Sequence, residues 1–460
     1  MEAQLTQGSV AGRLIRLAIP IAWGIFAIMA FNLVDTYFVS RLGTVPLAAI
    51  TFTFPVVMTV GSIAVGLGVG AASAISRAIG RGDPSQVRRL TTNSLLLAVL
   101  IVVPFCLLGL VTIDPLFRLL GADDQTLGLI RQYMEVWYLG MVFLIVPMVG
   151  NNALRAAGDA LSPSVIMTVS AGINVVLDPI LIFGGFGIPA LGLRGAAIAT
   201  VIARAASLIA ALAVLSRGKG MLSVHPGTLS VMLRSWARIL HVGIPAAGMF
   251  MIIPISTGIL TRMLASFGAG AVAAFGVATR IESFAFLLIY ALSTSLTPFV
   301  GQNTGAGRFE RVRRGLRWSY GFCLFWGLAA AVVLGLFGRP LATLFSKEQN
   351  PEVIGLAALY LRLVPISYGM QGISLMVIAA FNALGHPLPA TTLTFLRTVL
   401  ITVPLAWVLK LWLGPAGIFL GMAMANLMVG LLAYLWTHRV LRHAEALHGR
   451  EGFPFEAVGV

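Results

Sequence analysis

Two aspartates interrupt long apolar stretches of the chain. Asp35 lies toward the end of the first stretch, and Asp178 lies in the fifth, four residues after Asn174. Residues i and i+4 share one face of a helix, so Asn174 and Asp178 are predicted to point into one pocket. An aspartate at the bilayer centre costs roughly 2.5–3.5 kcal/mol on insertion scales, so acids at such positions indicate a function.

The chemistry available to these residues is cation binding. Thr200, in the sixth apolar stretch, is predicted to lie at a depth that matches the two acids. Two carboxylates, an amide and a hydroxyl suit a hard cation such as Na⁺, or a proton shared by two acids. Asp35, Asn174, Asp178 and Thr200 are therefore the predicted cation-coupling site. In the alternative, Asp35 is an interfacial cap and Asp178 merely precedes a proline break.

Two prolines and one further acid complete the set of candidate residues. Pro20 and Pro179 each remove a backbone donor, which predicts helix kinks that either bend with ion occupancy or are static. Glu282, two residues after Arg280, is either part of a structural ion pair or a second coupling or substrate site. Arg397 either pairs with an acid or lines a cavity.

The composition indicates which elements position these residues. Of 460 residues, 58% are hydrophobic and 10% charged, whereas a soluble domain has about 25% charged residues. A surface this apolar must face lipid. The net charge of +15 lies in loops and tails, as expected for cytoplasmic segments, so nucleic-acid binding is not predicted. Cys106 and Cys323 lie in apolar runs, which argues against a disulfide framework.

Twelve helical spans are predicted, because backbone in lipid must satisfy its own hydrogen bonds. Basic residues follow the even-numbered spans, which predicts an inner-membrane protein with both termini cytoplasmic. The predicted spans are 15–39, 46–76, 91–112, 131–152, 163–184, 190–216, 240–266, 272–301, 315–338, 357–383, 389–411 and 415–438.

An internal repeat divides the chain into halves. With an offset of 225, Ile19-Pro20 matches Ile244-Pro245, and Val87-Arg88-Arg89 matches Val312-Arg313-Arg314. Offsets of 227 and 222 extend the match to later glycines. The repeat predicts two six-helix lobes related by pseudo-twofold symmetry, with the transport path between them. The predicted parts are an N-terminal lobe (1–216), a cytoplasmic linker (217–239), a C-terminal lobe (240–440) and a cytoplasmic tail (441–460).

Nucleotide-dependent chemistry is not indicated. The run from Gly66 to Gly70 lies within an apolar span and lacks the third glycine of a dinucleotide fingerprint, so close helix packing is predicted there. No Walker A pattern is present, so transport is predicted not to be driven by ATP on this chain, and no cofactor is predicted beyond the coupling ion. The histidines lie mostly in loops and the tail, which argues against an intramembrane enzyme.

Several short segments resemble those of multidrug and toxic compound extrusion (MATE) transporters. They are Asn32-Leu-Val-Asp35, Ser76-Arg-Ala-Ile-Gly80-Arg-Gly82-Asp83, Arg155-Ala-Ala-Gly158-Asp159 and Asn174-Val-Val-Leu-Asp178-Pro179. The acids in the first and fifth spans resemble the DinF-like branch. This resemblance implies a V-shaped fold of two lobes, an architecture that can work as a monomer. It also implies antiport of amphiphilic or cationic organic compounds, drugs among them, against H⁺ or Na⁺. The alternative within the same superfamily is a flippase for lipid-linked precursors.

Overall fold

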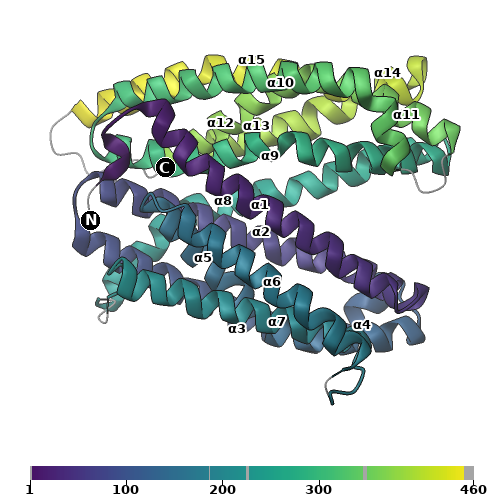
Figure 1. The fold of residues 1–460 in the computed structure, drawn as a ribbon. Coiled ribbons are helices and arrows are strands. Elements are labelled where there is room, and N and C mark those ends of the chain that lie inside the picture. The colour runs from purple at the N-terminus through teal and green to yellow at the C-terminus, as the bar shows by residue number, and fades with distance from the viewer. Residues whose placement is uncertain (1–2, 186, 224–226, 346–349, 450–460) are drawn as a thin grey trace. The chain divides into compact units, whose positions relative to one another are not determined.

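The fold is built from helices. The computed structural model describes residues 3–185, 187–223, 227–345 and 350–449 (Figure 1). Within these ranges the only extended pairing is an isolated bridge between Gly185 and Ile188. The α-helices are α1 (Val10–Ser40), α2 (Thr44–Gly80), α3 (Pro84–Leu119), α4 (Asp124–Leu139), α5 (Met141–Ala156), α6 (Leu161–Phe183), α7 (Gly192–Ala213), α8 (Leu229–Ala265), α9 (Ala269–Gly305), α10 (Phe309–Phe345), α11 (Pro351–Leu363), α12 (Tyr368–Leu384), α13 (Pro387–Phe395), α14 (Thr402–Leu413) and α15 (Pro415–Gly449).

Short irregular helices interrupt this series. A 3₁₀ turn, η1 (Gln4–Thr6), precedes α1, and another, η3 (Val364–Ser367), joins α11 to α12. Two π-helical segments are η2 (Val214–Gly218), after α7, and η4 (Leu396–Ile401), between α13 and α14.

The described residues contain eleven helical segments long and apolar enough to cross a membrane, and twelve if α4 and α5 form one span bent by 46°. The repeat favours twelve. The starts of α4 and α5, residues 124 and 141, lie 227 residues before the starts of α11 and α12, residues 351 and 368. Each half therefore has one interrupted span at the same place. The prediction of an all-α polytopic membrane protein is confirmed.

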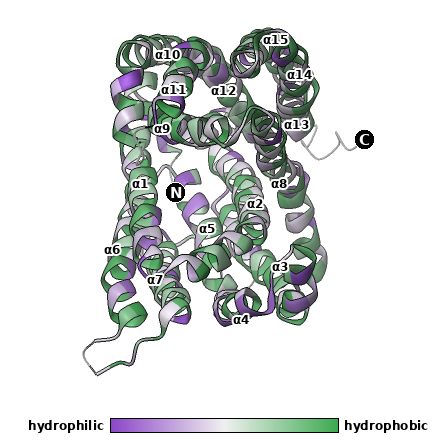
Figure 2. Cartoon of the chain, turned by 90° about the vertical axis from the view of Figure 1, so that its right-hand side faces the viewer, coloured by the Kyte–Doolittle hydropathy of each residue, from purple (hydrophilic) through white to green (hydrophobic). Residues whose placement is uncertain are grey.

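Apolar side chains cover the outside of the helices. Figure 2 shows hydrophobic residues along nearly every helix. Large apolar side chains such as Val111, 81% exposed, and Trp412, 83% exposed, are left largely uncovered. Such exposure is unfavourable in water and favourable in hydrocarbon, so these faces contact lipid.

The geometry repeats along with the sequence. Gly82 and Gly307, related by the offset of 225, both adopt left-handed backbone conformations, with φ of +73° and +70°. Gly195 and Gly417, related by the offset of 222, pack so closely against a neighbouring backbone that an added Cβ would lie 2.2 Å from a carbonyl oxygen. The glycines of the repeat therefore keep the same turns and the same close approaches in both halves.

The chain forms two compact units. The first contains residues 19–247, and the second contains residues 3–18 with the part of the chain that follows residue 247. Helix α1 thus begins in the second unit and continues in the first. Helix α8 begins in the first and continues in the second.

The predicted linker, 217–239, contains the start of a helix. Helix α8 already begins at Leu229, and residues 224–226 of the linker lie outside the described residues. Residues 229–239 include polar side chains such as Arg234 and Arg238, so the apolar pattern did not place them in a span. A helix can nevertheless extend beyond the bilayer, because its hydrogen bonds are internal. Residues 441–449 of the predicted tail continue α15, and residues 450–460 lie outside the described residues.

Within the first unit, α2 and α8 approach closely through glycines. A Cβ added to Gly66 would lie 2.5 Å from the carbonyl oxygen of Gly243, and one added to Gly70 would lie 2.2 Å from that of Ile239. Residues four apart form one stripe on α2, and small residues allow two helix backbones to approach. The glycine run is therefore a helix-packing motif, as predicted.

Within the second unit, the N-terminal segment is anchored to the junction of α9 and α10. The Leu5 side chain is 3% exposed, and its backbone N–H donates to Gln302 Oε1 at 3.1 Å. The guanidinium of Arg308 donates to the Thr6 carbonyl at 2.6 Å, and that of Arg311 donates to the Gly8 carbonyl at 2.9 Å. Charged donors make these bonds strong, so the segment before α1 is fixed to this unit.

Candidate cation-coupling site

The four predicted site residues lie on three neighbouring helices of the first unit. Asp35 is on α1, Asn174 and Asp178 are on α6, and Thr200 is on α7. Asp178 is 0% exposed and Asn174 is 1% exposed. Because a buried polar group without partners is costly, the bonds that these side chains form determine what the site can do.

Hydrogen bonds hold the three helices together beside the site. The Ser164 hydroxyl donates to the Pro20 carbonyl at 2.5 Å, and the Trp23 indole donates to the Thr168 hydroxyl at 3.1 Å, which fixes α1 to α6. The Ser170 hydroxyl of α6 donates to the Ala203 carbonyl of α7 at 2.8 Å.

Asn174 connects Asp178 to Thr200. A carboxylate oxygen only accepts, so the amide nitrogen of Asn174 faces Asp178. In this orientation the amide nitrogen donates to Asp178 Oδ2 at 2.7 Å, and the amide oxygen accepts from the Thr200 backbone N–H at 3.1 Å. The Thr200 hydroxyl lies 3.3 Å from the same end of the amide. The predicted i, i+4 pair on α6 thus points into one site, together with Thr200.

The carboxyl groups of Asp35 and Asp178 meet directly, within hydrogen-bonding reach of each other. No described residue donates to Asp178 Oδ1, although this atom is buried. Two facing carboxylates repel unless a proton or a cation lies between them. The described residues contain no group of three or more His, Cys, Asp or Glu side chains that could hold a metal ion. The arrangement can bind one proton between two acids, or one hard cation on mixed oxygen ligands.

Tyr133 is a neighbour of the site that the sequence patterns did not predict. This tyrosine of α4 lies close enough to interact electrostatically with both Asp35 and Asp178. The repeat contained the signal, since Tyr133 matches Tyr360 at the offset of 227 that also relates Gly158 to Gly385. Tyrosine is common in apolar spans, so its type alone did not single it out.

Both predicted kink residues lie inside continuous helices, Pro20 in α1 and Pro179 in α6. Neither proline therefore ends its helix. Pro20 lies next to the point where α1 changes unit, between residues 18 and 19. Bending of either helix with ion occupancy stays a prediction.

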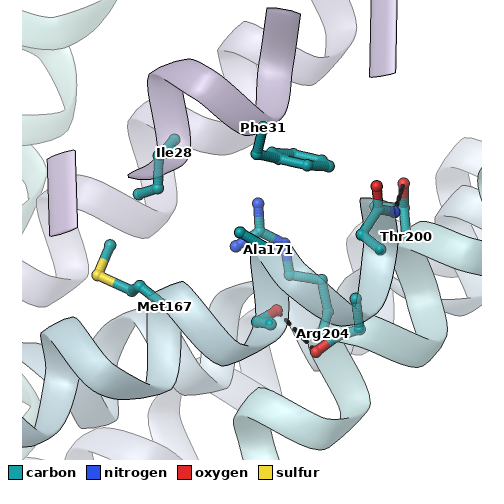
Figure 3. Close-up of a pocket in the computed structure, with 9 residues that line it drawn as sticks. Ile28, Phe31, Met167, Ala171, Thr200 and Arg204 are labelled. Atoms are coloured by element: carbon teal, nitrogen blue, oxygen red, sulfur yellow. Dashed lines mark hydrogen bonds between the residues drawn. The ribbon is translucent and has the colours of Figure 1, made fainter. Parts of the chain in front are cut away.

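A small pocket opens beside the acid pair, with a volume of about 300 Å³ that includes space open to the outside (Figure 3). Asn174 and Thr200 line it, and Arg204 of α7 extends toward Phe31 of α1. The pocket and the predicted coupling site therefore share two residues, Asn174 and Thr200. The full lining is Ile28, Phe31, Met167, Ser170, Ala171, Asn174, Thr200, Ala203 and Arg204.

The predicted second site lies in the second unit and centres on Glu282 of α9. Its carboxylate accepts a hydrogen bond from the hydroxyl of Tyr360, on α11. Arg397, in the π-helical segment η4, lies close enough to interact electrostatically with Glu282. The Tyr368 side chain is 0% exposed, and its hydroxyl has no hydrogen-bond partner among the described residues. Arg280 is exposed, and no described ion pair joins it to Glu282.

A different carboxylate of the first unit lies outside the spans, between α5 and α6. Asp159 accepts from the Ser162 backbone N–H at 3.0 Å and from Lys219 Nζ at 2.9 Å. Partial burial acts to raise the pKa of Asp159, but the hydrogen bonds from Ser162 and Lys219 outweigh it and lower the pKa below its usual value. Asp159 is therefore ionised and fixes the start of α6 beside the end of α7.

The fold and the buried acids define a polytopic membrane transporter. A family model described as MatE matches residues 20–180 and 245–408, one segment in each half, and their starts differ by the predicted offset of 225. The chain belongs to this family, as the resemblance implied. Members of the family are transporters and not enzymes.

Individual relatives cover nearly the whole chain. An FAD transporter of Shewanella oneidensis is 38% identical over 94% of this chain and 95% of its own length. A protein of Thermotoga maritima described as "Probable multidrug resistance protein NorM" is 28% identical over 89% of this chain and 88% of its own. The Vibrio cholerae MATE transporter VcmN in the bent form is 32% identical, with a TM-score of 0.90 over 95% of this chain and 98% of that one.

Proposed function

We propose that this chain is a cation-coupled antiporter that exports organic compounds, with Asp35, Asn174, Asp178 and Thr200 as the coupling residues. The observation that supports the proposal most is the buried contact between the carboxyl groups of Asp35 and Asp178, joined to Asn174 at 2.7 Å. Such a pair must take up a proton or a cation to lose its repulsion, and it can release that ion again.

The cycle that we propose is competition between ion and substrate. Entry of H⁺ or Na⁺ at Asp35 and Asp178 favours release of the substrate, and substrate binding favours loss of the ion. One elementary charge that crosses 100 mV contributes about 2.3 kcal/mol, so one or two ions can support a useful substrate gradient. Alternating access between two lobes would expose the site to each side in turn.

Amphiphilic or cationic organic compounds are the first candidate substrates. The multidrug resistance relative of Thermotoga maritima supports this class. FAD is the second candidate, because the Shewanella oneidensis FAD transporter is 38% identical over 94% of this chain. The two classes differ in charge, so one assay separates them. A flippase for lipid-linked precursors is the alternative from the same superfamily.

The setting of this activity is part of the proposal. The chain would act as a monomer of the DinF-like branch in the inner membrane, with both termini cytoplasmic. The basic loops after even-numbered spans support this orientation. Glu282 would be a second site in the other half, either structural or functional.

The test is transport by the purified protein in liposomes. Proton and Na⁺ gradients are imposed separately, and movement of a fluorescent cationic dye and of FAD is measured in each case. We expect one of the two gradients to drive at least one of the two substrates. Equal movement with and without both gradients, for both substrates, would contradict coupled antiport.

A further inference from the structure

The pocket beside the acid pair contains a cation that the coupling site does not use. Arg204 lies on α7 one turn after Thr200, and its side chain extends into the pocket toward Phe31 (Figure 3). Asp35 and Asp178 are not among the residues that line the pocket. The groups around this guanidinium are therefore neutral or apolar.

Arg204 has no partner among the residues that the structure describes. No described carboxylate forms an ion pair with it, and no described residue forms a hydrogen bond with it. A guanidinium offers five N–H donors, and its charge at membrane depth is costly unless something compensates it. A planar, forked donor of this kind matches carboxylate and phosphate groups.

A second guanidinium group without a carboxylate partner among the described residues contacts the lining of the same pocket. Met167 lines the pocket, and the guanidinium of Arg155 contacts its sulfur at 3.4 Å. Arg155 Nε is buried without a hydrogen-bond partner among the described residues. No described carboxylate pairs with Arg155. Two guanidinium groups thus give this side of the first unit a positive character that no described acid balances.

We propose that Arg204 binds the phosphate or pyrophosphate group of an aromatic organic anion, with Phe31 offering the face on which a flat ring stacks. The pocket is small, and its volume of about 300 Å³ includes space open to the outside, so it would hold this part of a dinucleotide and not the whole. The inference rests on the proposed transport function and names the substrate chemistry of the same region. It selects a phosphate-bearing substrate over a cationic one.

Three flavins test the proposal because they share one ring system and differ in phosphate. Riboflavin has none, FMN has one and FAD has a pyrophosphate. Binding to the purified, detergent-solubilised protein is measured at one fixed pH, without any gradient, from the change in flavin fluorescence. We expect the wild type to bind FAD and FMN more tightly than riboflavin.

Substitution of Arg204 should remove this preference. In Arg204→Gln the affinity for FAD is expected to fall by about tenfold to a hundredfold, the usual effect of losing a hydrogen bond to a charged group. The affinity for riboflavin should stay within about threefold. Arg204→Lys keeps the charge and should retain part of the preference. Arg194→Gln, an exposed position on the same helix, is the matched control.

Several outcomes would overturn the proposal. They are absence of FAD binding to the wild type, unchanged FAD binding in Arg204→Gln, and an equal loss for all three flavins, which would mean that Arg204 only supports the structure of the pocket. If Arg204→Gln does not fold, Arg204→Met and Arg204→Lys give the same comparison. Arg204→Met, which removes the charge, must lose more of the preference for phosphate-bearing flavins than Arg204→Lys, which keeps it. Since no gradient is used, a failure here is distinct from a failure of coupled transport.

Discussion

The two halves contain buried polar centres built around matching tyrosines, and the centres differ in their charge balance. In the first unit Tyr133 lies near two acids, Asp35 and Asp178. In the second unit Tyr360 is bonded to one acid, Glu282, and Arg397 lies nearby. Duplication thus preserved the scaffold and the tyrosine but not the charges.

This difference indicates which centre can act as a switch. Two acids without a cation repel each other, so occupancy by H⁺ or Na⁺ changes the energy of the site strongly. An acid beside an arginine is already compensated, so an added ion changes less. We infer that the first centre responds to the ion gradient and that the second mainly stabilises its unit.

The largest expected effect concerns the acid pair. Asp178→Asn and Asp35→Asn should each reduce gradient-driven transport by roughly 100-fold, because an amide cannot change its charge and a coupling energy of this size is typical. Transport by reconstituted protein measures this. Asp124→Asn, an exposed acid paired with Arg118, is the control. Normal gradient-driven transport in both variants would remove the distinction between the two centres.

The second prediction concerns Glu282. Glu282→Gln should destabilise the protein by roughly 3 kcal/mol, because it leaves Arg397 without its acid in an apolar interior. Transport by the folded fraction should stay within about threefold of wild type. Thermal melting of the purified variant measures the loss of stability. The double variant Glu282→Gln with Arg397→Gln should recover part of that stability. Loss of coupling with unchanged melting would instead make this centre a second coupling site.

The third prediction uses the matching tyrosines. Tyr133→Phe should weaken coupled transport by roughly threefold to tenfold with little change in melting, because this tyrosine interacts electrostatically with the switching acids. Tyr360→Phe should instead lower stability by about 1–2 kcal/mol with little change in coupled transport, since it removes the hydroxyl that donates a hydrogen bond to Glu282. The same effect from both substitutions would mean that the centres are functionally equivalent.

The smallest expected effect lies outside both centres, at Asp159. A carboxylate whose pKa is lower in the folded than in the unfolded chain stabilises the protein above the unfolded value of about 3.9, and this stabilisation is lost as pH falls through the folded value. Asp159→Asn should therefore lower stability by less than about 1 kcal/mol at neutral pH, as for other partly exposed ion pairs. Melting curves should converge with the wild type at low pH. A difference in melting temperature between the variant and the wild type that stays constant at all pH values would contradict ionisation of Asp159 as the source of the stabilisation.

Much of the fold could be predicted from the sequence, because apolar length determines a membrane span and the repeat determines the halves. The glycine pairs, such as Gly82 with Gly307, were particularly informative because they fix backbone turns that only glycine adopts easily. The contact of Asn174 with Asp178 followed from helical spacing. The start of α8 at Leu229 did not follow, because a helix can continue beyond the apolar stretch.

The packing around the site could not be predicted in the same way. Arg204 was one of several arginines near spans, and only the pocket distinguishes it from the others. Tyr133 depends on a bent span, α4 with α5, whose geometry leaves little trace in composition. The assignment of residues 3–18 to the second unit depends on contacts between residues far apart in the sequence, such as Leu5 and Gln302, which are separated by 297 positions.

The anchor of the N-terminal segment has a consequence for biosynthesis. The carbonyls of Thr6 and Gly8 leave the ribosome long before Arg308 and Arg311, which bind them and are made only after most of the spans. During most of synthesis the segment therefore relies on water and lipid headgroups for its hydrogen bonds, and the closure of so long a loop is a late event. A nascent chain stalled before α10 should leave its first residues open to protease, and the completed chain should protect them.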